Sequence, residues 1–232
     1  RYLGNLCRGD LGQSYYTHNN VFSEYMARFP ATLQMAGLSI VFALLMALPV
    51  GIISAIKRNS IFDHCGTVFA LLCVSMPTFW LGLLLIILFS LKLGWLPSGG
   101  ATTPQSIIMP SLTTGANNSG AITRTTRSAM LDVIRQDYIR TARAKGVGEG
   151  KVIGKHALKN AMVSILTIIG VQFGTVLGGA VICETVFAWP GVGRLIVDSI
   201  NRRDLPMVMG CIIMTTIFVS LVNLIVDILY AY

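Results

Sequence analysis

Histidine and cysteine, the residues that most often carry chemistry, are few in this sequence and lie far apart. His18, His64 and His156 are too dispersed for a metalloprotease pair or for a nucleophile with its base. The five cysteines, without a CxxC pair, offer neither a disulfide framework nor a metal motif. We therefore expect no catalytic residue and no metal site in this chain.

Glycine followed by lysine is the nearest approach to a nucleotide-binding loop. A P-loop needs Gly-x-x-x-x-Gly-Lys-Ser/Thr, because its backbone amides cradle phosphates. Gly154 precedes Lys155 but has Glu149 in the place of the first glycine, and the pair Gly150-Lys151 fails in the same way. We expect no ATPase site and no cofactor here, so any energy-requiring work must draw on a partner or an ion gradient.

The composition is that of a membrane protein. Hydrophobic residues make up 53% of the 232 residues and charged residues only 12%, against about 25% charged in soluble domains. This excludes an ordinary soluble globule, and it excludes disorder. The formal net charge of +8 then indicates membrane orientation before it indicates a nucleic-acid partner.

Apolar stretches long enough to cross a bilayer, about 20 residues, occur four times, at residues 31–56, 65–91, 161–183 and 207–229. A fifth stretch, 106–123, is rich in Ser, Thr, Gly and Asn, and it is either a helix covered by others or an exposed loop. We predict an all-α polytopic fold with five spans. Pro77 should kink its span and leave carbonyl groups for a neighbouring helix to cover.

The basic residues are divided unequally between the two sides of this arrangement. One side carries eleven Lys and Arg residues and the other carries seven, so the first side is predicted to be the cytoplasm. Nine of the eleven lie in the segment 124–160. Residues 1–30 and the loop 184–206 fall on the external side.

The segment 124–160 has the pattern of a helix, a glycine turn and a second helix. Apolar residues at helical spacing predict one amphipathic helix in its first half (Leu131, Ile134, Tyr138, Ala142). Gly146 begins the turn, and residues 151–160 lead back into the membrane. The basic residues either enforce topology at the lipid surface or belong to a docking element on which a cytoplasmic partner pushes. Nucleic-acid binding lacks any recognisable module.

Two further groups are candidates for packing or contact. Gly170, Gly174 and Gly178 share one helical face, which predicts close helix packing or a subunit interface. The external loop carries an even charge mixture, which would contact a partner, reach into a pathway or remain solvated. Its candidate residues are Glu184, Arg194, Asp198, Arg203 and Asp204.

Blocks of sequence along the whole chain point to one transporter family. They are DYIRTARAKG at 137–146, HALKNA at 156–161, SMPTFW at 75–80, GWLP at 94–97, ETVFAWPGVGR at 184–194 and RDLP at 203–206. In this order they resemble the permease subunits of binding-protein-dependent ABC transporters, in the branch that imports dipeptides, oligopeptides and nickel. The first of these blocks resembles the family's cytoplasmic signature loop.

The resemblance implies an organisation and a set of partners. It implies an external segment at 1–30 and a transmembrane domain at 31–232, with a sixth span before the first residue given. The segment 124–160 then becomes the coupling loop. The implied partners are a second, related permease in a heterodimer, two ATP-binding subunits that hold ATP and magnesium, an external binding protein and the lipid bilayer, with no nucleic acid. The implied location is the cytoplasmic membrane of a bacterium or archaeon.

The resemblance also assigns roles within the coupling loop. The family's Glu-Ala-Ala triplet aligns with Arg140, Thr141 and Ala142, so only its second alanine and the later Gly146 are kept. Ala142 and Gly146 are expected to set packing and the turn, while Arg140, Arg143 and Lys145 would form polar contacts at the rim. We expect a permease for short peptides; nickel import, an ion-driven carrier and a membrane scaffold are the alternatives.

Overall fold

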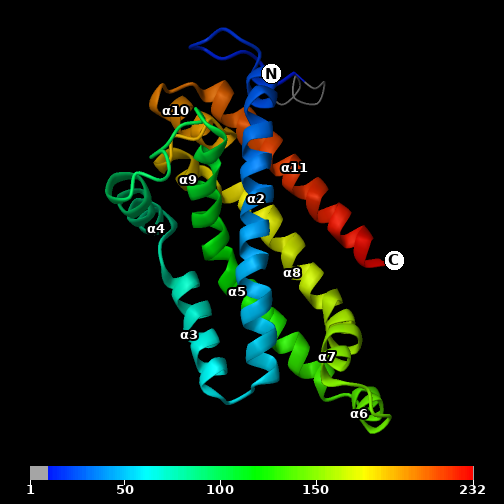
Figure 1. Cartoon of the computed structure of the whole chain (residues 1–232). Coiled ribbons are helices and arrows are strands. Elements are labelled where there is room, and N and C mark those ends of the chain that lie inside the picture. Colours follow the sequence, from blue (N-terminus) through cyan, green and yellow to red (C-terminus); the bar gives the residue numbers. More distant parts are fainter. Residues whose placement is uncertain (1–9, 232) are drawn as a thin grey trace. The chain divides into compact units, whose positions relative to one another are not determined.

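The computed structural model describes residues 10–231 and consists of helices joined by short loops (Figure 1). Within these residues there is no strand, only an isolated bridge between Gln13 and Asn20, so the all-α prediction is confirmed. The elements are α2 (Val21–Ile56), α3 (Ile61–Ser75), α4 (Thr78–Leu85), the π-helix η1 (Ile86–Lys92), the 3-10 helix η2 (Pro104–Ile107), α5 (Ile108–Ile134), α6 (Asp137–Ala144), α7 (Glu149–Lys151), the π-helix η3 (Val152–Ala157), α8 (Leu158–Gly179), α9 (Val181–Val186), α10 (Val192–Asn201) and α11 (Leu205–Ala231).

The chain divides into two compact units. Unit 1 contains residues up to 39 together with 78–114 and 173–225, and unit 2 contains 40–77, 115–172 and the residues from 226 onward. Helices α2, α5 and α8 each pass from one unit into the other. The loop between α5 and α8 belongs to unit 2, and the loop 184–206, predicted to be external, belongs to unit 1.

Three continuous helical segments of the described chain are long and apolar enough to cross a membrane: Val21–Ile56, Glu149–Gly179 and Leu205–Val226. The span predicted at 65–91 is instead a bent pair, α3 followed by α4 and η1, with the break between Ser75 and Thr78. Pro77 explains the break, because proline donates no backbone hydrogen bond and disfavours a helical residue before it. The helix predicted to begin at residue 31 begins at Val21.

The carbonyl groups freed at this break are covered within unit 2. A residue other than proline at 77 would donate its N–H to the carbonyl of Cys73. Instead, Asn117 Nδ2 of α5 donates to Cys73 O and to Met76 O, both at 3.3 Å. The prediction that a neighbouring helix covers these carbonyls is confirmed.

The polar stretch 106–123 lies mostly in α5, and most of its side chains there are buried. Several of its hydroxyl groups are satisfied within the helix, because they donate to the carbonyl three or four residues earlier, while Ser111 Oγ donates to Met35 O of α2 at 3.4 Å. The bonds within the helix are Thr113 to Met109, Thr114 to Pro110, Ser119 to Ala116 and Thr123 to Ser119. Of the two alternatives that the sequence leaves open, the structure therefore shows the covered helix and not the exposed loop.

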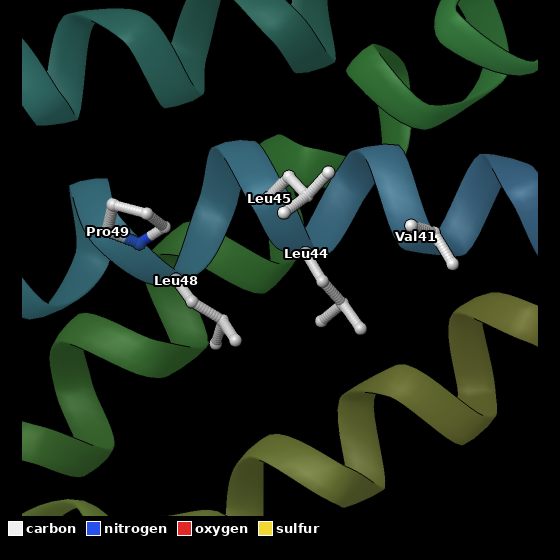
Figure 2. A pocket seen from close by; sticks show the side chains of 5 residues that line it. All are labelled: Val41, Leu44, Leu45, Leu48 and Pro49. Carbon is white, nitrogen blue, oxygen red and sulfur yellow. The ribbon is translucent and has the colours of Figure 1, made fainter.

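An apolar hollow of about 380 Å³ lies along α2 in unit 2. Its lining residues are Val41, Leu44, Leu45, Leu48 and Pro49, shown in Figure 2. Leu44 and Leu48 point to the same side of the helix, as their four-residue spacing requires. The lining side chains are all hydrocarbon, so they offer no group that would bind a polar substrate.

Candidate functional site

The segment 124–160 contains a short independent helix, not the single long one that its apolar spacing predicts. Helix α5 continues to Ile134, Gln136 is extended, and α6 starts at Asp137 (Figure 1). The break changes the helical phase, so Ile139 is 0% exposed while Tyr138 is 44% exposed. The prediction that Tyr138 continues the apolar face of α5 is therefore wrong, and Ile139 takes that place.

Ile139 fixes α6 to the rest of unit 2. It belongs to a buried cluster with Met130 of α5 and with Val152 and Ala157 of η3. Val152 and Ala157 are five residues apart, and the wider turn of a π-helix brings that spacing onto one face. Ala142 is partly buried against the same cluster. One side of α6 is thus anchored, and the other side remains free.

Gly146 ends α6 in the left-handed conformation, with φ +77°. Its N–H donates to Arg143 O at 2.9 Å, and the Val147 N–H donates to Ala142 O at 3.2 Å. These two bonds form the Schellman motif that commonly ends a helix at glycine. A Cβ at Gly146 would meet no described atom within 4 Å, so the backbone conformation, not crowding, requires glycine.

An ion pair closes the turn. Arg143 Nη2 donates to Glu149 Oε1 at 2.6 Å and Arg143 Nε donates to Glu149 Oε2 at 3.1 Å. Both side chains are largely exposed, so solvent screens their attraction, but the pair links α6 to the start of α7. The sequence prediction missed Glu149; its signal is the opposite charge six residues beyond Arg143.

The free side of α6 is polar and exposed. Arg140 lies 3.9 Å from Asp137 with both side chains largely in solvent, and Thr141 Oγ1 donates to Asp137 O at 3.0 Å. Lys145, at the C-cap, is exposed as well. A rigid, anchored helix with basic and hydroxyl groups facing outward is a surface suited to docking.

An ion pair in unit 2 joins Arg127 of α5, which is partly exposed, to Asp63 of α3, which is buried. Arg127 Nε donates to Asp63 Oδ1 at 2.6 Å and Arg127 Nη2 donates to Asp63 Oδ2 at 2.7 Å. The Asn59 N–H also donates to Asp63 Oδ2, at 3.0 Å. The sequence prediction counted Arg127 only as a basic residue, because nothing local connects it to a carboxylate 64 positions away.

The three glycines of α8 face α11 of the same chain. In unit 2, a Cβ at Gly170 would lie 2.4 Å from Val226 Cγ1. In unit 1, a Cβ at Gly174 would lie 2.8 Å from Asn223 Oδ1, and one at Gly178 would lie 3.9 Å from Val219. This face of α8 therefore packs against α11 within the chain, where close approach needs small residues.

Glu184 of α9 is fully buried in unit 1, with 0% exposure. Thr32 Oγ1 donates to Glu184 Oε1 at 2.6 Å, and the Arg194 N–H donates to Glu184 Oε2 at 3.1 Å. Burial raises the pKa of the Glu184 carboxyl above its usual value, and these hydrogen bonds offset part of the rise. Glu184 therefore does not belong to a solvated surface, one of the alternatives that the sequence leaves open.

The position of Glu184 also explains why residues 191 and 193 are glycine. The N-cap of α10 is Gly191, which has no side chain to cap the helix, and Glu184 accepts from the first turn in its place. A Cβ at Gly191 would lie 2.2 Å from Glu184 Oε1, and one at Gly193 would lie 2.5 Å from Val181 Cα. The glycines allow the carboxyl group to approach the helix end.

The other charged candidates of the loop 184–206 have different surroundings. Arg194 lies 3.8 Å from Asp198 and donates from Nη1 to Ala188 O at 2.6 Å. Arg203 is exposed, with φ +57°. Asp204 is 3% exposed and accepts from Ser14 Oγ. Burial acts to raise the pKa of Asp204, but the hydrogen bonds outweigh it and the pKa is lowered.

Comparison with known proteins relates the chain to transport components. Residues 47–232 match the family described as binding-protein-dependent transport system inner membrane component. The chain is 42% identical over 257 residues to the di/tripeptide transport system permease protein DppB of Pseudomonas aeruginosa, covering 99% of this chain and 76% of the relative. It is 45% identical over 230 residues to the glutathione transport system permease protein GsiC of Escherichia coli K12, covering 99% and 75%.

Solved structures have the same fold. A chain of the MetNI methionine ABC transporter in an inward-facing conformation matches with a TM-score of 0.77 at 18% identity, over 90% of this chain and 95% of that one. A chain of an amino acid ABC transporter matches with a TM-score of 0.70 at 13% identity, over 100% and 98%.

Proposed function

The chain belongs to the family of binding-protein-dependent transport system inner membrane components, and from this premise we propose that it forms half of the translocation pathway for short peptides. As a member it is a multi-pass membrane permease of an ABC importer, which works with ATPase and binding-protein partners. We propose the bacterial cytoplasmic membrane as its location and a second, related permease as the other half of the pathway.

The observation that carries the peptide substrate is the identity of 42–45% along nearly the whole chain to relatives named for di/tripeptide and glutathione transport. Glutathione is itself a tripeptide, so both names describe short peptides. Nickel import, which the sequence resemblance leaves open, has less support because the relatives cited carry peptide names.

We propose that α6 passes the work of the ATPase subunits to the membrane helices. The proposal is supported by its anchored side, which contains Ile139, and by its free side, which carries Arg140 and Thr141. A rigid helix fixed to the ends of α5 and α8 transmits a push as a displacement of those helices. ATP and magnesium would be bound by the partner subunits, and this chain would supply no ATPase chemistry.

The proposal is tested in proteoliposomes that contain the complete importer with its binding protein. We expect uptake of labelled dipeptide, tripeptide or glutathione that needs ATP and the binding protein, and that stops when the P-loop lysine of the ATPase subunits is replaced. Nickel salts should not compete. Uptake driven by an ion gradient without ATP, or nickel uptake in preference to peptide, contradicts the proposal.

A further inference from the structure

Two tyrosines and two arginines form an exposed patch at one end of unit 1. Tyr15 and Tyr16 are 71% and 62% exposed, and Arg202 and Arg203 are exposed beside them on the turn before α11. The Arg202 guanidinium lies 4.3 Å from the centre of the Tyr16 ring. These four residues are called the Tyr–Arg patch below. Tyrosine and arginine are the residue types that dominate binding energy at protein interfaces.

The patch is held in place from beneath by Asp204. Asp204 accepts from Ser14 Oγ, and its Oδ1 accepts from the Tyr15 N–H at 3.1 Å. Ser14 Oγ in turn accepts from the Thr17 N–H at 2.9 Å. The loop and the turn are therefore tied together by buried bonds, although Ser14 and Asp204 are 190 residues apart. Tyrosines fixed in this way lose little conformational freedom when a partner binds.

The backbone beneath the patch is strained in two places. His18 and Arg203 both have φ +57°, a left-handed conformation that is unfavourable for residues with a side chain. Such strain persists only where the surroundings impose it, and it gathers at functional surfaces. Here the two residues lie in the loop and the turn that carry the exposed tyrosines and arginines.

The length of α2 places the patch away from lipid. The apolar part of this helix, residues 31–56, spans about 39 Å, more than the roughly 30 Å of a hydrocarbon core. Residues 21–30 come before it, contain Glu24 and Arg28, and add about 15 Å of helix. Tyr15 and Tyr16 precede even these residues. They therefore lie beyond the depth at which interfacial tyrosines anchor a membrane protein, and a water-soluble partner fits them better.

We propose that the Tyr–Arg patch is the surface on which the external binding protein docks, and that it pairs with carboxylate groups on that protein. The proposal rests on the function proposed above, which supplies a binding protein, and on the charge distribution, which predicts that this end is external. Arginine offers paired donors that match a carboxylate, and the tyrosine rings offer rigid apolar area around them. Arg202 and Arg203 would guide the encounter and the tyrosines would hold it.

The test measures how much binding protein is needed to stimulate ATP hydrolysis by the complete importer in nanodiscs. We expect Arg202→Glu with Arg203→Glu, and separately Tyr16→Ala, to raise the half-saturating concentration of binding protein about tenfold. The maximal rate at saturation should stay unchanged. The shift from the arginine variant should shrink at high salt, because exposed charges are screened.

Lys92→Glu is the matched control. Lys92 is exposed in η1 of the same unit and on the same predicted side, so it changes charge without touching the patch. A shift from Lys92→Glu in proportion to its charge change, two units against four in the arginine variant, would mean that only net charge matters and would overturn the docking surface. If the binding protein stimulates the wild-type importer and the patch variants have the same half-saturating concentration, only the docking surface is overturned. Patch variants that lose anionic-lipid binding instead would also overturn the docking surface alone. No stimulation of the wild-type importer by its binding protein would overturn both proposals.

Discussion

Thr32 and Glu184, 152 residues apart in the chain, form a buried hydrogen bond of 2.6 Å in which the threonine hydroxyl donates to the carboxyl group. The same hydroxyl accepts from the Val192 N–H at 2.8 Å. One small polar cluster therefore joins α2, α9 and the first turn of α10. It replaces the side-chain cap that Gly191 does not supply.

Removal of the Glu184 carboxyl should loosen this end of unit 1. Glu184→Ala leaves the Thr32 hydroxyl and the Arg194 N–H without their buried acceptor, at about 1–3 kcal/mol for each unsatisfied group. Glu184→Gln keeps an acceptor oxygen and should cost less. The apparent melting temperature of the purified complex measures the difference. A variant with alanine as stable as the one with glutamine would contradict the role of Glu184 as a cap.

The same carboxyl should make stability depend on pH in a defined direction. Burial raises the pKa of Glu184 above its ordinary value of 4.5, so the folded protein favours the protonated form. This contribution is complete below pH 4.5 and is lost as the pH rises through the higher pKa of the folded protein. The melting temperature of Glu184→Gln should fall less than that of the wild type over that interval. If the melting temperatures of the wild type and of Glu184→Gln changed with pH in the same way, the contribution of Glu184 would be ruled out.

Glycine at 146 should matter for coupling more than glycine at 148. Gly146→Ala places a side chain at φ +77°, at about 1 kcal/mol, and should shift the end of α6. Gly148 is the matched control, because it has an ordinary backbone conformation and open space around it. We expect Gly146→Ala to transport fewer peptides per ATP hydrolysed than the wild type. Gly148→Ala should transport as many peptides per ATP as the wild type. Equal ratios in both variants would argue against the role of the turn.

Asp63 and Arg127 should behave as one unit. Breaking the pair by Asp63→Asn or Arg127→Gln leaves one partner without its ionic hydrogen bonds. Because the Arg127 side chain is partly exposed, we expect a cost of about 1–3 kcal/mol. The exchange Asp63→Arg with Arg127→Asp restores opposite charges and should recover part of the lost stability. Thermal unfolding of the single and double variants gives the coupling energy. Additive losses in the double variant would show that the two residues act independently.

Much of the helical framework follows from local properties of the sequence. The apolar length of 31–56 and 207–229 is sufficient to predict α2 and α11, and Pro77 is sufficient to predict a break. For the polar stretch 106–123 the sequence leaves a covered helix and an exposed loop open, and the structure shows the helix α5, in which several hydroxyl groups bond to their own backbone. The predictions of α2, α11 and the break succeed because hydrophobicity and backbone chemistry act over a few residues.

Helix phase and the ends of helices were less predictable. The spacing of Leu131 to Ala142 suggests one helix, but the chain breaks at 135–136 and buries Ile139 in place of Tyr138. Competing apolar residues on adjacent faces give similar local patterns. The cluster formed with Met130 and Val152 decides between them.

The sequence by itself determined a multi-pass helical protein, its most basic segment and its family, because long apolar runs and family blocks are read residue by residue. Only the tertiary structure decided which charged residues are buried and which are exposed. Glu184, Asp63 and Asp204 have partners 64 to 190 residues away, and no local pattern connects such positions. The loop 184–206, which carries an even mixture of charges, is therefore divided into the buried Glu184 and Asp204 and the exposed Arg203 of the Tyr–Arg patch.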